Sequence, residues 1–133
     1  MSRVTTNDVM ITGMGIVSPV ATGVDDFYRA LKEGRSGGVR IDQIQDEAGN
    51  LPLELGDINT RVGAPVLDFD VGDLLSAKQI KRSTRPNLFT LLAAQEALLD
   101  AGYELEELDP ESDEGRYRIP GENPERFGVL MGT

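Results

Sequence analysis

Two short runs of consecutive apolar residues, near opposite ends of the chain, constrain the fold more than any other feature. Val9–Thr12 runs into a glycine, and Phe127–Met131 follows a long acidic stretch. Continuous apolar runs of this length are typical of strands buried on both faces, as in parallel sheets covered by helices. The two runs therefore predict an α/β fold with a small, mostly parallel sheet and flanking helices.

Three segments between these runs have the features of helices. Asp25–Glu33 has acids in its first turn and Gly34 as a left-handed C-cap. Gly72–Arg82 predicts a second, short helix. The longest is predicted at Pro86–Gly102, where a proline suits the helix start and a glycine ends it. Its apolar face follows the i, i+3, i+4, i+7 pattern, and its alanines allow close packing: Leu88, Leu91, Leu92, Gln95, Leu98 and Leu99, with Ala93, Ala94 and Ala97.

The rest of the chain gives weaker structural signals. Residues 36–57 predict a loop with one weak strand, and Arg61–Asp70 predicts a short edge strand, because Pro65 cannot occupy a central strand. The 133 residues correspond in size to one ordinary domain. No apolar run approaches eighteen residues and no apolar leader precedes the first strand, so we expect a cytoplasmic protein without a membrane span.

The glycines of the stretch "TGMGIVSP" raise the alternative of nucleotide binding. Gly13 and Gly15 fit the first two positions of the G-x-G-x-x-G fingerprint, but Ser18 stands at the third. Pro19 then interrupts the place where the helix should begin, and the predicted helix starts only near Asp25. We therefore interpret this corner as structural, with the glycines letting the backbone turn sharply against a neighbouring element. A stabilising effect of NAD or ATP would contradict this interpretation.

Charge is distributed unevenly along the chain. The net charge is −10, which argues against a nucleic-acid binder. Residues 104–125, predicted as an acidic loop, contain nine acidic residues against only Arg116 and Arg118. By contrast, residues 76–87 have no acid and four cations at helical spacing: Lys78, Lys81, Arg82 and Arg85. Such a cluster is ordinarily the solvated end of a helix, where cations are favourable. The functional alternative is that the cluster binds an acidic partner.

The order of these elements resembles β-ketoacyl-acyl-carrier-protein synthases of the elongating type. In that family a first strand runs into T-G-x-G-x-x-(S/T)-P and then into a helix, as in Val9–Ile41. Leu67–Arg82 is similar to the family segment D-F-x-x-x-D-x-x-x-x-K-x-x-R-(R/K). Leu92–Gly102 and Arg126–Thr133 match the long helix and the strand that follows it. The resemblance therefore covers almost the whole chain in the expected order.

The resemblance implies a thiolase-like fold, with residues 1–133 as an N-terminal portion of the synthase domain. It also implies acyl transfer to a cysteine, then decarboxylative condensation with malonyl-carrier protein assisted by two histidines. The chain contains no cysteine and no histidine, so we expect no catalytic residue within it, and no cofactor or metal. The implied partners are acyl carrier protein and the rest of the synthase, in a homodimer or heterodimer.

In related synthases, basic residues at positions matching Lys78, Lys81 and Arg82 dock the acidic helix of the carrier protein. Arg85 has no clear counterpart and is a weaker candidate. Two departures from the family pattern leave the pathway open: the sequence Ser83–Pro86, and an acidic loop, Glu111–Pro124, that is longer than usual. Fatty-acid synthesis, polyketide synthesis, a non-catalytic chain-length partner subunit and a carrier-protein-binding module all remain compatible with the sequence.

Two acidic pairs receive structural interpretations. Asp25 and Asp26 are helix-start acids, and Asp68 and Asp70 lack the further oxygen ligands that calcium requires.

Overall fold

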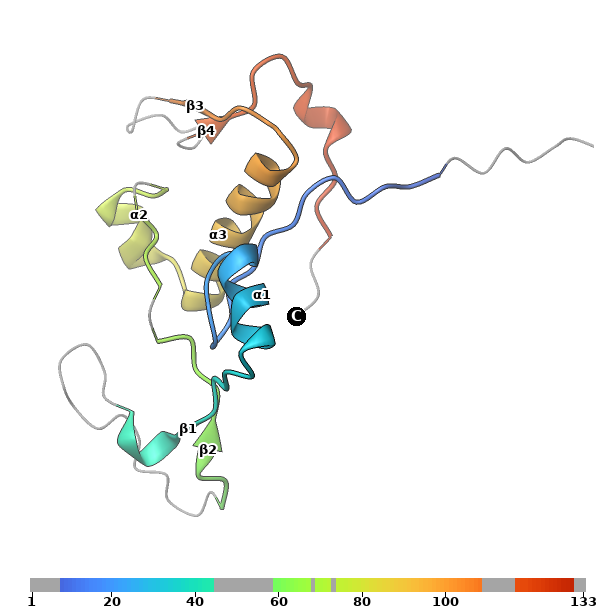
Figure 1. Cartoon of the computed structure of the whole chain (residues 1–133). Coiled ribbons are helices and arrows are strands. Elements are labelled where there is room, and N and C mark those ends of the chain that lie inside the picture. Colours follow the sequence, from blue (N-terminus) through green and yellow to red (C-terminus); the bar gives the residue numbers. More distant parts are fainter. Residues whose placement is uncertain (1–7, 45–58, 68, 73, 109–116, 131–133) are drawn as a thin grey trace, which may run out of the picture.

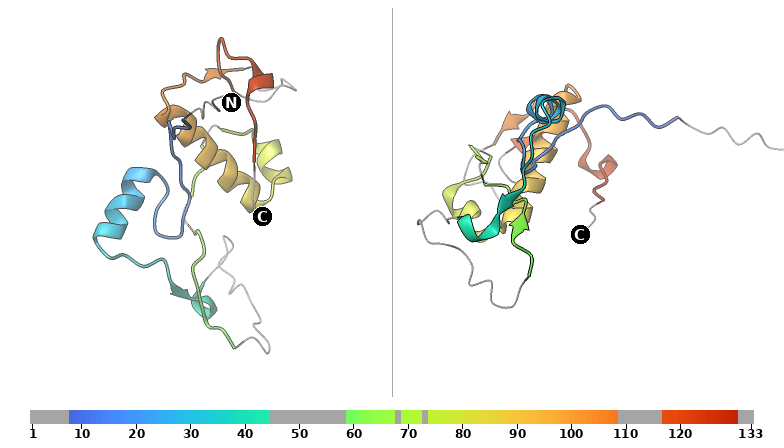
Figure 2. Two further views of the ribbon diagram at one scale, coloured as in Figure 1. Left: turned by 90° about the vertical axis from the view of Figure 1, so that its right-hand side faces the viewer. Right: turned by 60° about the horizontal axis from the view of Figure 1, so that its bottom comes forward.

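A long central helix organises the chain. The computed structural model describes residues 8–44, 59–67, 69–72, 74–108 and 117–130 (Figure 1). Helix α3 (Arg85–Asp100) runs through the middle, α1 (Val24–Lys32) and α2 (Ala77–Arg82) lie on its two flanks, and a small pair of strands projects away from it (Figure 2). α3 is thus the central element of the described chain, with that pair of strands lying apart from it.

The boundaries of α3 follow from its capping residues. Thr84 precedes the helix in an extended conformation, and Pro86 stands in the first turn, where its missing N–H costs no helical hydrogen bond. At the other end Gly102 adopts a φ of 84°. Its N–H donates to the Leu99 carbonyl at 3.0 Å, and that of Tyr103 donates to Leu98 at 3.0 Å. These two bonds form a Schellman motif, and the predicted long helix is confirmed.

Helix α1 ends in the same way. Gly34 has a φ of 66°, and its N–H donates to the Leu31 carbonyl at 3.1 Å, while the N–H of Arg35 donates to Ala30 at 2.9 Å. The predicted C-cap is therefore confirmed, and the helix lies within one residue of its predicted bounds. Ala30 is fully buried and faces the rest of the structure, whereas Tyr28 and Leu31 remain exposed.

Helix α2 is shorter than predicted. The sequence pattern indicated Gly72–Arg82, but the helix begins only at Ala77. Gly72, with a φ of 49°, lies in a turn in which the Leu74 N–H donates to the Val71 carbonyl at 3.0 Å. Ser76 then caps the helix, so the residues before it belong to the turn and not to α2.

The described strands form two antiparallel pairs. Strand β1 (Val39–Arg40) pairs with β2 (Val62–Gly63), and β3 (Glu106–Glu107) pairs with β4 (Tyr117–Arg118). β1 and β2 correspond to the predicted weak strand and edge strand. Two single 3₁₀ turns complete the described elements, Ile41–Gln43 and Pro124–Arg126. The segment predicted as an acidic loop therefore includes two short strands, and no parallel sheet forms among the described residues.

The two apolar runs do not form buried strands, and this prediction is wrong for the described residues. Val9–Ile11 is extended but unpaired, and Ile11 is 84% exposed. Residues 127–130 are also without strand pairing, and Leu130 is 100% exposed. A strand needs a neighbour for its backbone N–H and C=O groups, and the described residues supply no neighbour here. Met131 lies outside the described residues.

Little of the described chain is buried. Ala30 and Leu88 are the two buried hydrophobic residues among those described, and no helix in the described ranges is long and apolar enough to cross a membrane. Leu88 lies in the first turns of α3. The uncovered apolar side chains, Val129 and Leu130 among them, form surfaces that a further polypeptide could cover.

Candidate functional site

The glycine corner packs directly against α3. A Cβ atom placed on Gly13 would lie 2.1 Å from the Ala97 carbonyl oxygen, and one on Gly15 would lie 1.9 Å from that of Ala93. Neither glycine has a positive φ, so the requirement for glycine here is one of space. Small residues face each other on both sides of this contact, which lets the backbone of the N-terminal segment lie on the helix. The corner is therefore structural, as predicted, but the glycines are needed for close packing on α3 and not for a left-handed turn.

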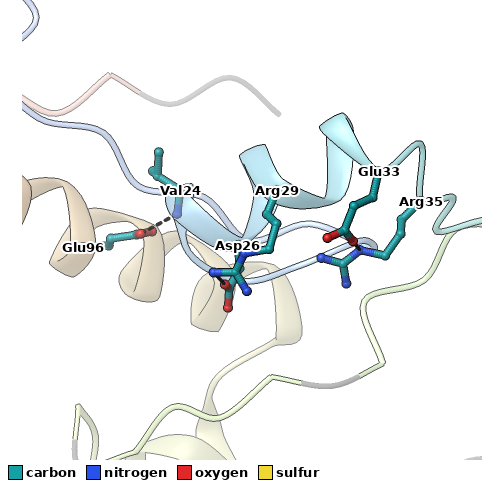
Figure 3. Close-up of polar contacts among 6 residues, drawn as sticks. All are labelled: Val24, Asp26, Arg29, Glu33, Arg35 and Glu96. Carbon is teal, nitrogen blue, oxygen red and sulfur yellow. Dashed lines mark hydrogen bonds and ion pairs between the residues drawn. The ribbon is translucent and has the colours of Figure 1, made fainter.

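Two carboxylates of α3 bind the backbone of the segment that leaves this corner. Glu96 Oε2 accepts a hydrogen bond from the Ile16 N–H at 2.8 Å, and its Oε1 accepts one from the Val24 N–H at 2.7 Å (Figure 3). Asp100 Oδ2 accepts from the Met14 N–H at 2.9 Å. The N-cap residue Gly23 has no side chain to cap α1, so Glu96 performs this role from another helix. The N-terminus of α1 is thus occupied by a protein carboxylate, which agrees with the rejection of nucleotide binding at this corner.

These carboxylates were not predicted from the sequence. The hydrogen bond from Val24 to Glu96 spans 72 residues, and that from Met14 to Asp100 spans 86. One local signal was available: Glu96 and Asp100 are separated by one helical turn and lie beside the small residues Ala93 and Ala97. This signal marks one face of α3 but does not identify the backbone groups that the two acids bind.

The basic side chains of α2 are all exposed. Lys78, Lys81 and Arg82 form no ion pair and no side-chain hydrogen bond among the described residues. A capping box starts the helix: the Gln79 N–H donates to Ser76 Oγ at 3.3 Å, and the Ser76 N–H donates to Gln79 Oε1 at 2.9 Å. We call the three cations the basic surface of α2. It presents three positive charges that have no acidic partner among the residues the structure describes, on a six-residue helix in a chain of net charge −10.

Arg85 does not belong to this basic surface. Ser83 and Thr84 are extended and separate the two helices, so the i, i+7 relationship to Lys78 has no geometric meaning. The guanidinium of Arg85 instead lies over the rings of Phe69 and Phe89. The weaker standing of Arg85 as a docking residue agrees with this position.

An apolar groove of about 1020 Å³ opens along another face of α3. The groove is formed partly by the face of α3 that the apolar periodicity predicts to be covered. Leu74, which precedes α2, also lines the groove. Arg118 and Glu122 are its charged residues. Its main apolar lining residues are Leu74, Leu91, Ala94, Leu98, Leu105, Leu108, Ile119, Pro120, Pro124 and Phe127.

The acidic candidates have structural roles where they are described. Asp26 forms an ion pair with Arg29 at 2.7 Å within α1, and Asp25 lies in the first turn of the same helix (Figure 3). Asp70 Oδ1 accepts a hydrogen bond from the Gly72 N–H at 2.8 Å, and Asp68 lies outside the described residues. No group of three potential metal ligands occurs among the residues that the structure describes.

The glycine corner packs closely on the alanines of α3. The short helix α2 lies on another side of α3 and presents an exposed basic surface. The sequence model of the family described as "Beta-ketoacyl synthase, N-terminal domain" matches residues 6–133. The chain therefore belongs to the β-ketoacyl synthase family. This membership implies a thiolase-like α/β fold, which agrees with the mixture of helices and short strands described above.

Curated relatives come from fatty-acid and polyketide systems. A 3-oxoacyl-[acyl-carrier-protein] synthase 2 of Synechocystis sp. is 29% identical over 133 residues, which cover 100% of this chain and 26% of the relative. The tetracenomycin polyketide synthase ketoacyl synthase beta subunit of Streptomyces glaucescens is 37% identical over 102 residues, or 76% of this chain and 22% of the relative. The alpha subunit of the same synthase is 32% identical over 134 residues, or 100% of this chain and 26% of the relative. The chain thus spans about a quarter of the length of the curated relatives it matches.

Proposed function

We propose that this chain is the N-terminal portion of a β-ketoacyl-acyl-carrier-protein synthase. The complete enzyme would be a cytoplasmic transferase that condenses an acyl group with malonyl-carrier protein, with loss of carbon dioxide, in fatty-acid or polyketide synthesis. The observation that carries this proposal is the family match over residues 6–133. The order of the apolar run, the glycine corner and the helices in the sequence supports the same assignment.

Residues 1–133 would be inactive alone. The chemistry requires a thiolate as nucleophile and leaving group, and groups that stabilise the developing enolate and oxyanion. The chain contains neither cysteine nor histidine, so these groups would come from the rest of the synthase. The exposed apolar side chains at Val9–Ile11, Val129 and Leu130 are the surface that this remaining polypeptide would cover, in a homodimer or heterodimer.

The basic surface of α2 would dock the acyl carrier protein. Lys78, Lys81 and Arg82 are exposed and uncompensated among the described residues, and a partner of opposite charge would be steered to them. The capping box at Ser76 fixes where the helix begins and hence which side chains it presents. The role of the chain in the enzyme would therefore be to bring the carrier protein to the condensing site.

Binding to a purified bacterial acyl carrier protein at low and moderate salt tests this role. Lys78→Glu/Lys81→Glu is expected to abolish most of the binding at low salt, because it reverses two docking charges. The matched control, Lys32→Glu/Arg61→Glu, makes the same change in net charge away from α2 and should retain binding close to the unmodified chain. If both double variants lose binding equally, the effect comes from the overall charge of the chain. That result would contradict docking at α2.

A partner subunit without condensing activity is the second candidate. The higher identity to the beta subunit of the tetracenomycin synthase, 37% against 32% to the alpha subunit, favours this candidate over part of the chain. The two candidates differ in the coding sequence that follows Thr133. A later cysteine with two histidines would support a condensing enzyme, and a continuation without the cysteine would support the partner subunit. A stop at that point would favour a carrier-protein-binding module.

A further inference from the structure

Arg85, the first residue of α3, holds a small aromatic cluster together. Its Cζ atom lies 4.7 Å from the ring centroid of Phe69 and 5.6 Å from that of Phe89. The two rings meet edge to face, with centroids 4.8 Å apart. The Nη2 group of Arg85 also donates a hydrogen bond to the Val66 carbonyl oxygen. A planar guanidinium can stack on rings and donate in its own plane at the same time, which an ammonium cannot do.

This cluster joins the two ends of the segment that carries α2. The chain leaves the cluster at Phe69, passes through α2 and returns to it at Arg85. Holding the ends of a loop together removes many of the conformations otherwise open to it. Since α2 has only six residues, it is too short to be stable in isolation. The presentation of its cations therefore depends on how its ends are anchored.

We infer that Arg85 is a positioning residue: it closes the loop that carries α2 and so presents the basic surface to an acidic partner. This inference rests on the docking role proposed above. Arg85 is exposed and keeps its positive charge. Its guanidinium is already engaged by Phe69, Phe89 and Val66, so we assign it positioning and not direct contact with the partner. Lys78, Lys81 and Arg82, by contrast, form no such contact among the described residues.

The charge-preserving variant Arg85→Lys separates positioning from docking. It keeps the positive charge and removes the planar group, so we expect the affinity for acyl carrier protein to fall roughly two- to fivefold. The dependence of the affinity on salt should keep its slope, because the number of docking charges is unchanged. Lys78→Ala should instead give a shallower salt dependence, because it removes a docking charge. Phe89→Leu should behave like Arg85→Lys, since it removes an aromatic ring without changing any charge.

Tryptic cleavage provides a readout that does not require the carrier protein. The bonds after Lys78, Lys81 and Arg82 should be cut faster in Arg85→Lys than in the unmodified chain, because the loop is less constrained. The bond after residue 85 precedes Pro86 and resists trypsin in both proteins, so the substitution adds no confounding site. Circular dichroism of both proteins checks that α3 is retained.

The outcomes are distinguishable. Absence of carrier binding by the unmodified chain at low salt would defeat the proposed docking role, and the proteolysis rates would still test Arg85. Unchanged affinity and unchanged cleavage in Arg85→Lys would overturn the positioning role. So would unchanged affinity in Arg85→Lys together with a shallower salt dependence in Arg85→Ala, since this would make Arg85 a docking charge.

Discussion

The carboxylate of Glu96, in the C-terminal half of α3, caps the N-terminus of α1 through the N–H of Val24 at 2.7 Å. Its second oxygen accepts from the N–H of Ile16 at 2.8 Å, so one side chain fixes both ends of the connection between the glycine corner and α1. The residue that should cap α1 locally is Gly23, with a φ of 93°. The capping group of α1 therefore comes from a distant helix and not from the residue before α1. The stability of α1 consequently depends on its contact with α3 through Glu96.

Replacing Glu96 should detach α1 from α3. Glu96→Ala leaves two backbone donors without their partner, and we expect a loss of about 1–3 kcal/mol in the free energy of unfolding. Urea unfolding followed by circular dichroism measures this loss. Asp25→Asn is the control, because Asp25 is an exposed acid in the first turn of α1 and its neutralisation should change stability little. Equal stability of Glu96→Ala and the control variant would contradict the capping role.

Gly15→Ala should be strongly destabilising. The new Cβ would lie 1.9 Å from the Ala93 carbonyl oxygen, so the N-terminal segment would have to move away from α3, at a cost of about 1–3 kcal/mol or more. Gly128→Ala is a matched control, since a Cβ there meets nothing within 4 Å and the φ is not positive. Thermal melting should show a clear fall for the first variant and almost none for the second. Similar melting temperatures would mean that the close contact does not exist in solution.

Ser76→Ala should weaken α2 and its docking function together. The substitution removes the hydroxyl that accepts from the Gln79 N–H, and an N-cap of this type is worth about 1 kcal/mol. Carrier-protein affinity measured by titration calorimetry should fall with it. Thr84 occupies the N-cap position of α3 without a side-chain capping bond, so Thr84→Ala should leave the affinity unchanged. A larger effect at Thr84 than at Ser76 would contradict the account of α2.

Asp42 should titrate at lower pH than an ordinary aspartate. Arg40 Nε donates to Asp42 Oδ1 at 3.0 Å, and this hydrogen bond, with the positive charge, lowers the pKa of the carboxyl. The stabilising contribution is present above the ordinary pKa of aspartate and disappears as the pH falls through the lowered one. NMR titration of the side-chain carboxyl should show its pKa moving upward in Arg40→Ala. If the pKa of Asp42 is the same in Arg40→Ala as in the unmodified chain, the ion pair between Arg40 and Asp42 does not form in solution.

Local signals predicted the helices well. The long helix was predicted from its apolar periodicity. Its ends were predicted from Pro86 and Gly102, each of which lies within one helical turn of the boundary that it sets. The start of α2 could also have been predicted, because Ser76 and Gln79 form a capping box. The apolar residues before Ser76 favoured a longer helix instead. The glycine corner was correctly interpreted as structural from the failed fingerprint at Ser18.

The strands and the long-range carboxylates could not be predicted in the same way. An apolar run such as Val9–Ile11 has the composition of a strand, but pairing depends on a neighbour that the described residues do not provide. The partners of Glu96 lie 72 and 80 residues away, so no local pattern contains them. The contacts of Arg85 likewise depend on Phe69, which lies sixteen residues earlier in the chain. Helical periodicity alone grouped Arg85 with the three cations of α2, although the family pattern already made it the weaker docking candidate.

An NMR titration of the ¹⁵N-labelled chain with acyl carrier protein is the most direct test of docking at α2. We expect amide shift changes concentrated at Ala77–Arg82 at low salt, which shrink as salt rises. Amides of α1 and of the β1–β2 pair should remain unchanged. Shift changes centred on those elements, or no change at α2 at low salt, would contradict the assignment of carrier-protein docking to Lys78, Lys81 and Arg82.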